Sequence, residues 1–247
     1  MVKKRIDILL VDRGLAPTRA KAQALIMAGT VLVDGQPATK PGKMVDEGAE
    51  VLVKEKLPYV SRGGLKLEGA IREFDIDVTG LVALDVGSST GGFTDCLLQR
   101  GAKRVHAVDV GKGLIDWKLR NDSRVHLIEG RNIRELQEDE LGEKVDIAVI
   151  DVSFISLKKV LPVVVRFLKS CGTILALVKP QFEVGKGEVG KGGIVRDVEK
   201  QRRVVEELKE FARSMGLEVK GECPSPIKGA KGNREFWLYL SMDGKIS

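Results

Sequence analysis

Cysteine and histidine are scarce in this chain, and this limits the chemistry that it can use. Its 247 residues include three cysteines, Cys96, Cys171 and Cys223, and no pair has C-x-x-C spacing. A scattered, odd number of cysteines is typical of reduced thiols in a cytoplasmic protein and disfavours a disulfide scaffold. His106 and His126 lie in strand-like runs, with no cysteine or histidine at ligand spacing. We therefore predict structural histidines and no metal site.

Long apolar runs are also lacking. No stretch approaches the roughly 20 residues that cross a bilayer. The basic start of the chain is not followed by the apolar segment and cleavage site of a secretory signal. The sequence therefore predicts a cytoplasmic protein without a membrane partner. Its 41 Lys+Arg exceed its 35 Asp+Glu, which gives a net charge of +6. This excess is compatible with a polyanionic partner but is too small to establish one.

About the first 60 residues differ in pattern from the rest. Apolar residues at helical spacing predict two short helices within 5–29, with Thr18 as the N-cap of the second. Short β runs follow at 30–38 and 49–56, around turn residues. A proline and a glycine pair then mark a connector. We predict a small α+β domain at 1–59, a connector at 60–64 and a second domain at 65–247.

In the second domain, apolar strands alternate with helices. Strands are predicted at 81–87, 104–111, 124–130, 145–154 and 172–180, and helices at 91–101, 156–170 and 197–216. This alternation is typical of a mostly parallel sheet covered by helices on both faces. Two closing strands, at 217–227 and 234–242, are joined by a polar loop. They are expected to form a hairpin, so that one strand is antiparallel.

A glycine-rich turn follows the first strand of this domain, in the segment DVGSSTGGF. Glycines at a strand-to-helix turn let a ligand approach the backbone. The dinucleotide pattern G-x-G-x-x-G fails here, because Gly87 is followed by Ser88 and Ser89. This break disfavours a nicotinamide oxidoreductase. The competing interpretation is a tight turn without a ligand.

S-adenosylmethionine fits the surrounding residues better than a dinucleotide does. It has no pyrophosphate, and it needs an acid or carbonyls near its amino group and a carboxylate for its ribose diol. Asp85 precedes the glycine turn and Asp109 ends the next strand, where they could serve these two groups. Asn132 lies where an adenine contact could fall, although a turn asparagine is an equal alternative. The predicted cofactor contacts are Asp85, Gly87, Ser88, Gly91, Gly92, Phe93, Asp109, Asn132 and Asp151.

Four charged residues stand at strand ends or near the first strand. Lys179 ends the strand at 172–180 and Asp151 lies near the end of the strand before it. Carboxyl ends of neighbouring parallel strands meet at one edge of a sheet. Lys66 precedes the first strand on a predicted helix, and Glu235 begins the last, antiparallel strand. The four are therefore expected to converge beside the cofactor. A surface ion pair is the competing interpretation for any one of them.

At these residues the chain resembles a known family. The segments SRGGLKLEGAI, DVGSSTGGFTDCLLQ, VDVGKGLIDWKLR, DVSFISL, LVKPQFEVG and KGNREFWLYL resemble signatures of the TlyA proteins, a branch of the FtsJ-like RNA 2′-O-methyltransferases. That class carries a Lys-Asp-Lys-Glu set, which Lys66, Asp151, Lys179 and Glu235 match. The segment APTRAKAQALIMAGTVLVDG resembles the RNA-binding fold of ribosomal protein S4.

The resemblance implies a Rossmann-like class I methyltransferase with a mostly parallel seven-stranded sheet, and a small RNA-binding domain before it. The implied reaction transfers a methyl group from S-adenosylmethionine to a ribose 2′-OH, with cytidine in ribosomal RNA or ribosomal subunits as the target. Lys179 would take the proton of the hydroxyl as general base, Asp151 would orient it and Glu235 would hold Lys66. In-line positioning supplies the rest, and no metal is required.

The small domain would hold the RNA. Through Val60 it has a charge of about +3, and candidate phosphate contacts are Arg5, Arg13, Arg19, Lys21, Lys40 and Lys43. A solvated face is the competing interpretation for any one of them. The glycine-rich segment 182–193 is predicted to be a lid or an RNA-contact loop, with simple flexibility as the alternative.

Two further functions compete with this one. A membrane-active toxin is considered because relatives of the family have been labelled hemolysins. The helix at 197–216 is amphipathic, but its charges alternate in sign, as on a helix packed against a sheet. An RNA-binding protein with an inactive methyltransferase domain is the other alternative, and the intact set of four charged residues disfavours it.

Overall fold

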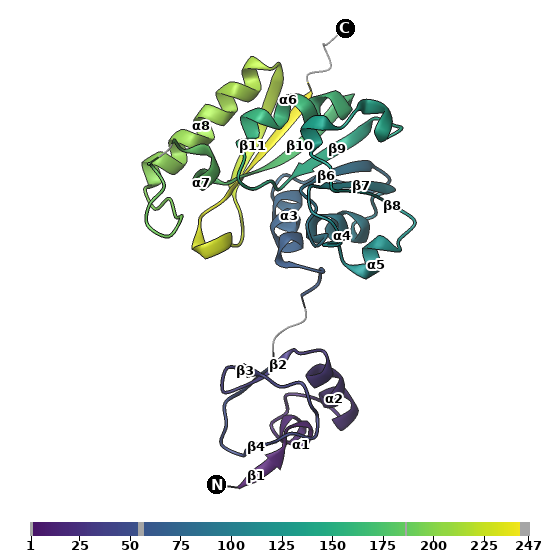
Figure 1. The fold of residues 1–247 in the computed structure, drawn as a ribbon, viewed down its shortest axis with the longest axis vertical. Helices are drawn as coiled ribbons and strands as arrows, with labels where there is room; N and C mark the ends of the chain where they lie inside the picture. The colour runs from purple at the N-terminus through teal and green to yellow at the C-terminus, as the bar shows by residue number, and fades with distance from the viewer. Residues whose placement is uncertain (1, 54–56, 186, 243–247) are drawn as a thin grey trace. The chain divides into compact units, whose positions relative to one another are not determined.

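The chain divides into two compact units, Met1–Leu57 and Pro58–Ser247, in a computed structural model that describes residues 2–53, 57–185 and 187–242 (Figure 1). The division falls two residues before the predicted end of the first domain at 59. Tyr59 is buried in a core of the second unit. The segment 60–64, predicted as a connector, runs into helix α3 (Arg62–Glu73). Each unit is described by itself below.

The first unit combines two helices with short strands, as predicted. Thr18 caps the second helix, because its side chain accepts a hydrogen bond from the backbone N of Lys21 at 3.2 Å. Strand β2 pairs with β3 and β5, and β1 pairs with β4, a pair that the sequence did not predict. Residues 54–56 of the predicted run at 49–56 lie outside the described residues. The elements are β1 (Lys3–Arg5), α1 (Ile6–Asp12), α2 (Arg19–Met27), β2 (Val31–Val33), β3 (Gln36–Pro37), β4 (Met44–Asp46) and β5 (Val51–Val53).

The second unit is built on a seven-stranded sheet in the order β11-β12-β10-β9-β6-β7-β8 (Figure 1). Neighbouring strands from β10 to β8 are parallel, and β12 is antiparallel to both β10 and β11. The predicted mostly parallel sheet with one antiparallel strand is confirmed. The strands are β6 (Val82–Val86), β7 (Arg104–Asp109), β8 (Val125–Glu129), β9 (Val145–Ile150), β10 (Leu168–Val178), β11 (Leu217–Pro224) and β12 (Phe236–Met242).

Helices cover both faces of this sheet (Figure 1). Successive residues of a strand point to opposite faces. Leu84 belongs to the core beneath α6 (Leu161–Val164) and α8 (Val198–Ser214). Its neighbour Ala83 belongs to the core beneath α3 and α4 (Gly92–Gln99). The remaining helical elements are η1 (Ile133–Glu135), η2 (Glu138–Glu140), η3 (Leu157–Lys159), η4 (Val165–Phe167), η5 (Ala230–Gly232), α5 (Trp117–Arg120) and α7 (Pro180–Glu183).

The continuous helix predicted at 156–170 is wrong. The segment is divided into η3, α6 and η4, and strand β10 already begins at Leu168. Pro162 lies in the first turn of α6, and a run of three valines follows it. Proline cannot donate a helical hydrogen bond and β-branched side chains are restricted in a helix. Both effects favour short helical turns over one long helix.

The strand register brings three charged positions to one edge of the sheet. Val86 and Ala176 both lie opposite Ile150, so the carboxyl ends of β6, β9 and β10 are level. Val178 pairs with Phe236 of the antiparallel strand. The next residues, Asp151, Lys179 and Glu235, therefore follow at the same edge. The site is thus a consequence of parallel strands that end together.

Candidate active site

Two lysine–carboxylate pairs lie at this edge of the sheet. The Nζ atom of Lys179 is 2.5 Å from Oδ1 of Asp151, and Nζ of Lys66 is 2.6 Å from Oε2 of Glu235. The side chains of the second pair are only 12% and 2% exposed. Removing one partner from a buried ion pair leaves the other charge uncompensated, which costs about 3–5 kcal/mol. The structure therefore brings together the four charged residues that the sequence selected.

Ser153, which the sequence analysis missed, is a third partner in this cluster. Its hydroxyl oxygen accepts a hydrogen bond from Lys179 Nζ at 2.9 Å. The Phe182 ring lies on α7, directly after Lys179, with its centroid 6.0 Å from the same nitrogen. The ammonium group is therefore held by one carboxylate, one hydroxyl and one aromatic face.

Glu183 joins the two loops that carry these residues. One of its carboxylate oxygens accepts a hydrogen bond from the Ser156 hydroxyl at 2.6 Å, and the other accepts one from the backbone N of Leu157 at 2.8 Å. Burial raises the pKa of Glu183 above its usual range. Glu183 thus joins the loop that follows Asp151 to the turn that follows Lys179. These contacts help to hold the side chains of Asp151 and Lys179 at a fixed distance from each other.

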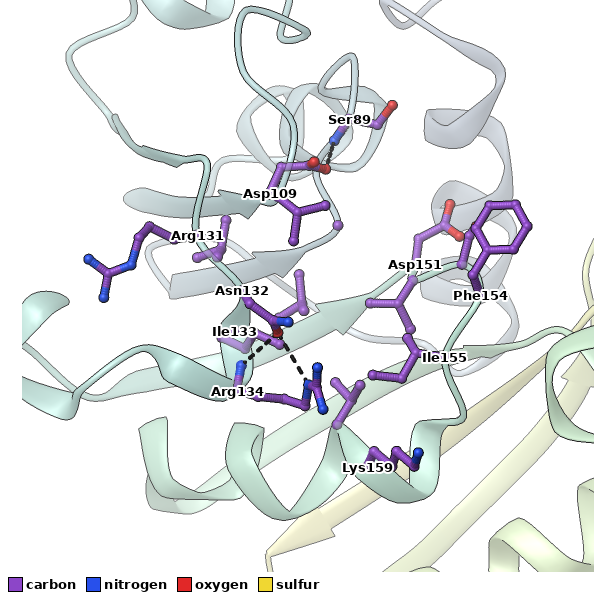
Figure 2. A pocket seen from close by; sticks show the side chains of 17 residues that line it. Ser89, Asp109, Arg131, Asn132, Ile133, Arg134, Asp151, Phe154, Ile155 and Lys159 are labelled. Atoms are coloured by element: carbon purple, nitrogen blue, oxygen red, sulfur yellow. Dashed lines mark hydrogen bonds between the residues drawn. The ribbon is translucent and has the colours of Figure 1, made fainter.

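A cavity of about 520 Å³ opens beside Asp151 at the carboxyl ends of β6, β7 and β9 (Figure 2). This is where open α/β sheets bind their ligands. Its lining includes four of the predicted cofactor contacts: Gly87, Asp109, Asn132 and Asp151. Gly87 has φ +85°, and a Cβ there would lie 2.5 Å from the carbonyl oxygen of Asp151. The glycine therefore allows the ends of β6 and β9 to approach each other at the cavity wall.

Asp109 is held rigidly in the cavity wall. Its Oδ2 accepts a hydrogen bond from the backbone N of Ser89 at 2.7 Å (Figure 2). Its Oδ1 accepts one from the backbone N of Gly111 at 2.6 Å. A carboxylate has about four acceptor positions, so two remain for a ligand. Asp109 can therefore receive a pair of vicinal hydroxyl groups.

Asn132 lines the same cavity but its side-chain oxygen is already engaged. It accepts hydrogen bonds from the backbone N of Arg134 at 3.1 Å and from that residue's Nε at 3.4 Å (Figure 2). These bonds make Asn132 the N-cap of η1. The turn role that competed with an adenine contact is thus present, and any ligand contact must use the remaining groups of this residue.

Comparisons with known proteins agree with this geometry. The FtsJ-like methyltransferase model matches residues 59–242, and the S4 domain model matches residues 4–51. The chain belongs to the FtsJ-like methyltransferase family. Among its relatives is the 16S/23S rRNA (cytidine-2′-O)-methyltransferase TlyA of Mycobacterium tuberculosis, which is 46% identical over 240 residues, or 96% of this chain and 90% of that protein.

Two other relatives of this methyltransferase carry a different name. Hemolysin A of Brachyspira hyodysenteriae is 40% identical over 237 residues, which cover 96% of this chain and 99% of that protein. A solved structure from Streptococcus thermophilus, provisionally named a hemolysin, is 46% identical with a TM-score of 0.75 and covers 98% of this chain and 89% of that chain. The predicted resemblance to the TlyA proteins is confirmed.

Asp85, one of the predicted cofactor contacts of the methyltransferase, is enclosed in the sheet. It lies inside β6 with no exposed surface and does not line the cavity. Its Oδ2 accepts a hydrogen bond from the Thr94 hydroxyl at 2.6 Å, whereas its Oδ1 has no hydrogen-bond partner among the described residues. Burial raises the pKa of Asp85 to about 7. Ser88 is also buried and does not line the cavity, where its exposed neighbour Ser89 takes that place.

Gly91, Gly92 and Phe93 also do not line this cavity. Gly91 has φ +92°, and a Cβ there would overlap the side chain of Leu119. A Cβ on Gly92 would overlap Ser61 and approach the backbone N of Gly64 to 2.9 Å. These glycines permit close packing of α4 against its neighbouring segments, and their predicted role in cofactor binding stays a prediction. The Phe93 ring packs 5.4 Å from that of Trp237 in the core.

Phe154 is a surface feature of the site that the sequence analysis missed. It lies three residues after Asp151, is 91% exposed and has φ +64° (Figure 2). Its ring centroid is 4.9 Å from that of Phe182. A bulky residue with left-handed backbone is strained, and such strain is concentrated at functional sites. The signal available in the sequence was an aromatic residue three positions after the acid that follows a predicted strand.

Three of the six predicted RNA contacts have structural roles in the first unit. Arg5 and Arg19 both donate hydrogen bonds at 2.9 Å to Oδ2 of Asp7, which is fully buried. Arg13 donates to the carbonyl oxygens of Ala49 and Glu47 at 2.8 and 2.6 Å. These arginines therefore stabilise the unit itself. The side chains of Arg5 and Arg19 remain 40% and 53% exposed, so both also keep N–H donors for a phosphate.

The other three predicted contacts, Lys21, Lys40 and Lys43, are exposed. None of them makes an ion pair with any residue in the described part of the chain. Their charges are available to a polyanion without the loss of an internal contact.

The hemolysin names of these relatives raise the question of membrane binding. Among the residues that the structure describes, no helix is long and apolar enough to cross a bilayer. The amphipathic helix α8 buries Val204, Val205, Leu208 and Ala212 in the core beneath it. Its apolar face is therefore already covered by the sheet and is not available to lie on a lipid surface.

The lid predicted at 182–193 stays a prediction. The predicted lid at 182–193 contains Lys186, which lies outside the described residues. In the rest of the segment, Glu188 binds Arg203 of α8 at 2.7 Å, and Gly190 forms a bridge with Ile194.

No group of three metal-type ligands occurs within 2–53, 57–185 and 187–242. The expectation that the reaction needs no metal is not tested by this observation.

Proposed function

We propose that this methyltransferase transfers a methyl group from S-adenosylmethionine to the 2′-OH of a cytidine ribose in ribosomal RNA. The observation that carries the proposal is the pair of lysine–carboxylate contacts, Lys179–Asp151 and Lys66–Glu235, at one edge of the sheet beside the cavity. The substrate class is supported by the family and by the printed activity of the TlyA relative. A ribosomal substrate implies action in the cytoplasm.

The residues of the cavity fit S-adenosylmethionine. The volume of about 520 Å³ lies within the roughly 300–1,000 Å³ of ligand sites. Asp109 keeps acceptor positions for a ribose diol, and the carboxylate of Asp151 lies at the far end of the wall towards Lys179. When bound, this cofactor supplies an electrophilic methyl group on a sulfonium cation.

The chain must remove the proton of the attacking hydroxyl, because an alcohol is a very weak acid. We assign this role to Nζ of Lys179, which can accept the proton only in its neutral form. Asp151 lies 2.5 Å from this nitrogen and Ser153 accepts a hydrogen bond from it at 2.9 Å, so its position is fixed from two sides.

Lys66 supplies a fixed positive charge beside the reacting ribose. Its contact with Glu235 is short and almost fully buried, so the ammonium group is held in one position. A lysine is a compact point charge suited to a phosphate or a polar hydroxyl. Glu235 therefore acts as a positioning residue for Lys66.

The exposed ring of Phe154 offers a stacking face for the target base. Sequence-specific RNA recognition commonly turns an unpaired base out of the stack and places it against an aromatic side chain. Phe154 is supported from behind by Phe182, whose ring is 4.9 Å away. The phosphates of the RNA would contact Lys21, Lys40 and Lys43, together with the exposed edges of Arg5, Arg13 and Arg19.

The test is methyl transfer from labelled S-adenosylmethionine to transcripts of both ribosomal RNAs and to isolated ribosomal subunits. The expected product is a 2′-O-methyl group, which makes one phosphodiester bond resistant to alkaline hydrolysis. A methyl group on a base would contradict the ribose assignment. RNA binding without any transfer to either form of substrate would instead favour an RNA-binding protein with an inactive catalytic domain. The Lys179→Ala variant is the control for contaminating activity.

A further inference from the structure

Exposed cations without a carboxylate partner gather around one loop of the methyltransferase unit. Most arginines and lysines elsewhere in this unit are paired, as Arg203 and Lys158 of neighbouring elements are with Glu188 and Glu207. Six of the exposed cations that make no ion pair with any described residue lie together, and they come from three segments of the chain. They are Arg62, Lys191, Arg196, Lys228, Lys231 and Arg234, and we refer to them as the second basic surface.

Direct contacts join the three segments. Arg62, at the start of α3, donates a hydrogen bond to the carbonyl oxygen of Lys228 at 3.0 Å. Asn233 is buried and donates to the carbonyl oxygen of Gly193 at 3.0 Å. A Cβ on Gly193 would lie 3.8 Å from Nζ of Lys231. The loop between β11 and β12 therefore lies beside the loop before α8, at the same end of the unit (Figure 1).

The second basic surface adjoins the two lysine–carboxylate pairs. Glu235 follows Arg234 directly in the chain, and a Cβ on Gly229 would overlap the Glu235 carboxylate that holds Lys66. Lys231 has φ +57°, a conformation that is uncommon for a residue with a side chain. The loop is thus a defined structure that adjoins the active site and directs its charges outward.

We propose that the second basic surface binds phosphates of the substrate RNA next to the nucleotide whose ribose reaches Lys179. This inference rests on the proposed function. Like charges held close together repel one another, so six cations without an ion-paired carboxylate favour the binding of a polyanion or of solvent ions. A sugar–phosphate backbone provides evenly spaced charges of the required sign.

The composition of these loops favours RNA over an anionic membrane. No large apolar side chain is exposed in the described segments 190–196 and 225–235. Membrane-surface segments combine basic residues with exposed apolar ones that enter the bilayer. The surface also lies against the site where the ribose must be held. Phosphate contacts there would fix the register of the strand and so the position of the reactive hydroxyl.

The test removes three of the charges from the full-length chain. The variant combines Lys228→Gln, Lys231→Asn and Arg234→Gln, with asparagine chosen because it tolerates left-handed backbone. The matched control combines Arg72→Gln, Lys103→Gln and Arg213→Gln. These are exposed cations without ion pairs among the described residues, on the last turns of α3 and α8 and just before β7. Both variants lose the same net charge.

The first variant is expected to bind ribosomal RNA transcripts about tenfold to hundredfold more weakly near physiological salt, and to lower the slope of log K against log salt by about 2. The control should change affinity less than about twofold. S-adenosylmethionine affinity and melting temperature should match wild type in both. Single-turnover methylation by the first variant should need more RNA for half-saturation than methylation by wild type or by the control.

Equal weakening by the two variants would overturn the inference, because the effect would then follow net charge alone. Unchanged RNA binding together with reduced binding to phosphatidylserine vesicles would overturn it in favour of a membrane partner. The binding measurement does not require methyl transfer. A wild-type chain that binds RNA through this surface but methylates a base would therefore contradict the proposed function and leave this inference intact.

Discussion

Asp7 in the first unit and Asp85 in the second are both fully buried carboxylates, yet their surroundings are opposite. Asp7 accepts hydrogen bonds from Arg5, Arg19 and Gln23. The Arg5 guanidinium, with these other donors, holds the pKa of Asp7 well below its usual range. Asp85 accepts one hydrogen bond, from a threonine hydroxyl, and burial raises its pKa to about 7.

The comparison shows that burial alone does not decide the charge of a carboxylate. The donors within reach decide it. In the first unit, three arginines make hydrogen bonds within the fold, two of them to Asp7, and the predicted RNA contacts without ion pairs to described residues are lysines. In the second unit, the nearby Asp151 disfavours a further negative charge at Asp85, and Asp151 itself is paired with Lys179. Negative charge is therefore concentrated at the edge where the chemistry is proposed.

The largest expected effect comes from removing the cation beside Asp151. Lys179→Ala should retain S-adenosylmethionine and RNA binding and lose methyl transfer by about a hundredfold to ten-thousandfold. Lys179→Arg should not restore activity, because a guanidinium group stays protonated. Single-turnover rates and melting temperatures of both variants provide the measurement. An active arginine variant with an unstable alanine variant would make Lys179 a structural partner of Asp151 instead.

The next effect tests the raised pKa of Asp85. A group whose pKa is raised in the folded state loses its contribution to stability as the pH rises from its unfolded value, 3.8, to its folded value of about 7. Asp85→Asn cannot ionise, so the stability of wild type relative to this variant should fall by a few kcal/mol across that window. Denaturant unfolding at pH 4, 5.5 and 7.5 provides the measurement. A difference that is independent of pH would remove Asp85 from the comparison.

Asp7 should show the opposite dependence on pH. Its folded pKa is lowered, so its contribution is present above the unfolded value of 3.8 and is lost as the pH falls below it. Asp7→Asn should destabilise the first unit by about 2–3 kcal/mol at neutral pH, because both arginines lose their partner. Hydrogen exchange in 2–53 and cofactor binding by the second unit separate a local from a global effect. Unchanged exchange in α1 and α2 would contradict the assigned role.

The smallest effects should distinguish the arginines of the first unit from its lysines. Neutralising Lys21, Lys40 and Lys43 together should weaken RNA binding a few-fold and leave the melting temperature unchanged, since these lysines make no ion pair with described residues. Arg19→Gln should lower stability, because it removes a hydrogen bond to Asp7. Anisotropy titrations with RNA, run beside thermal unfolding, provide the test. Lysine variants that unfold earlier than wild type would show that the two groups are not separate.

Much of the site followed from local patterns. Apolar runs marked where β9 and β10 end, and the topology of parallel strands then required Asp151 and Lys179 to meet. Thr18 was recognised as a cap from its position before an apolar-periodic segment. Such features depend on a few neighbouring residues or on a rule of sheet topology. Strand ends and helix caps can therefore be predicted from the sequence.

Other features depend on what covers a residue from far away in the chain. Asp85 and Asp109 look alike in the sequence, since each lies at or near the end of a strand before a glycine. In the tertiary structure, Asp85 is buried beside Thr94, whereas Asp109 lies in the cavity wall. The neighbours of Gly91 and Gly92 also come from elsewhere in the chain, because a Cβ on Gly91 would meet the side chain of Leu119 and one on Gly92 would meet the backbone of Gly64.

The sequence by itself determined the two units, the parallel sheet and the four charged residues at its edge, because periodicity and strand ends are local properties. Only the tertiary structure decided which carboxylate keeps its charge, which arginines are used internally and which cations meet around the β11–β12 loop. Lys191 and Lys231 are far apart in the chain, and the contacts of Asn233 bring their loops together. Electrostatic energy depends on distance and burial in space, and neither is contained in residue order.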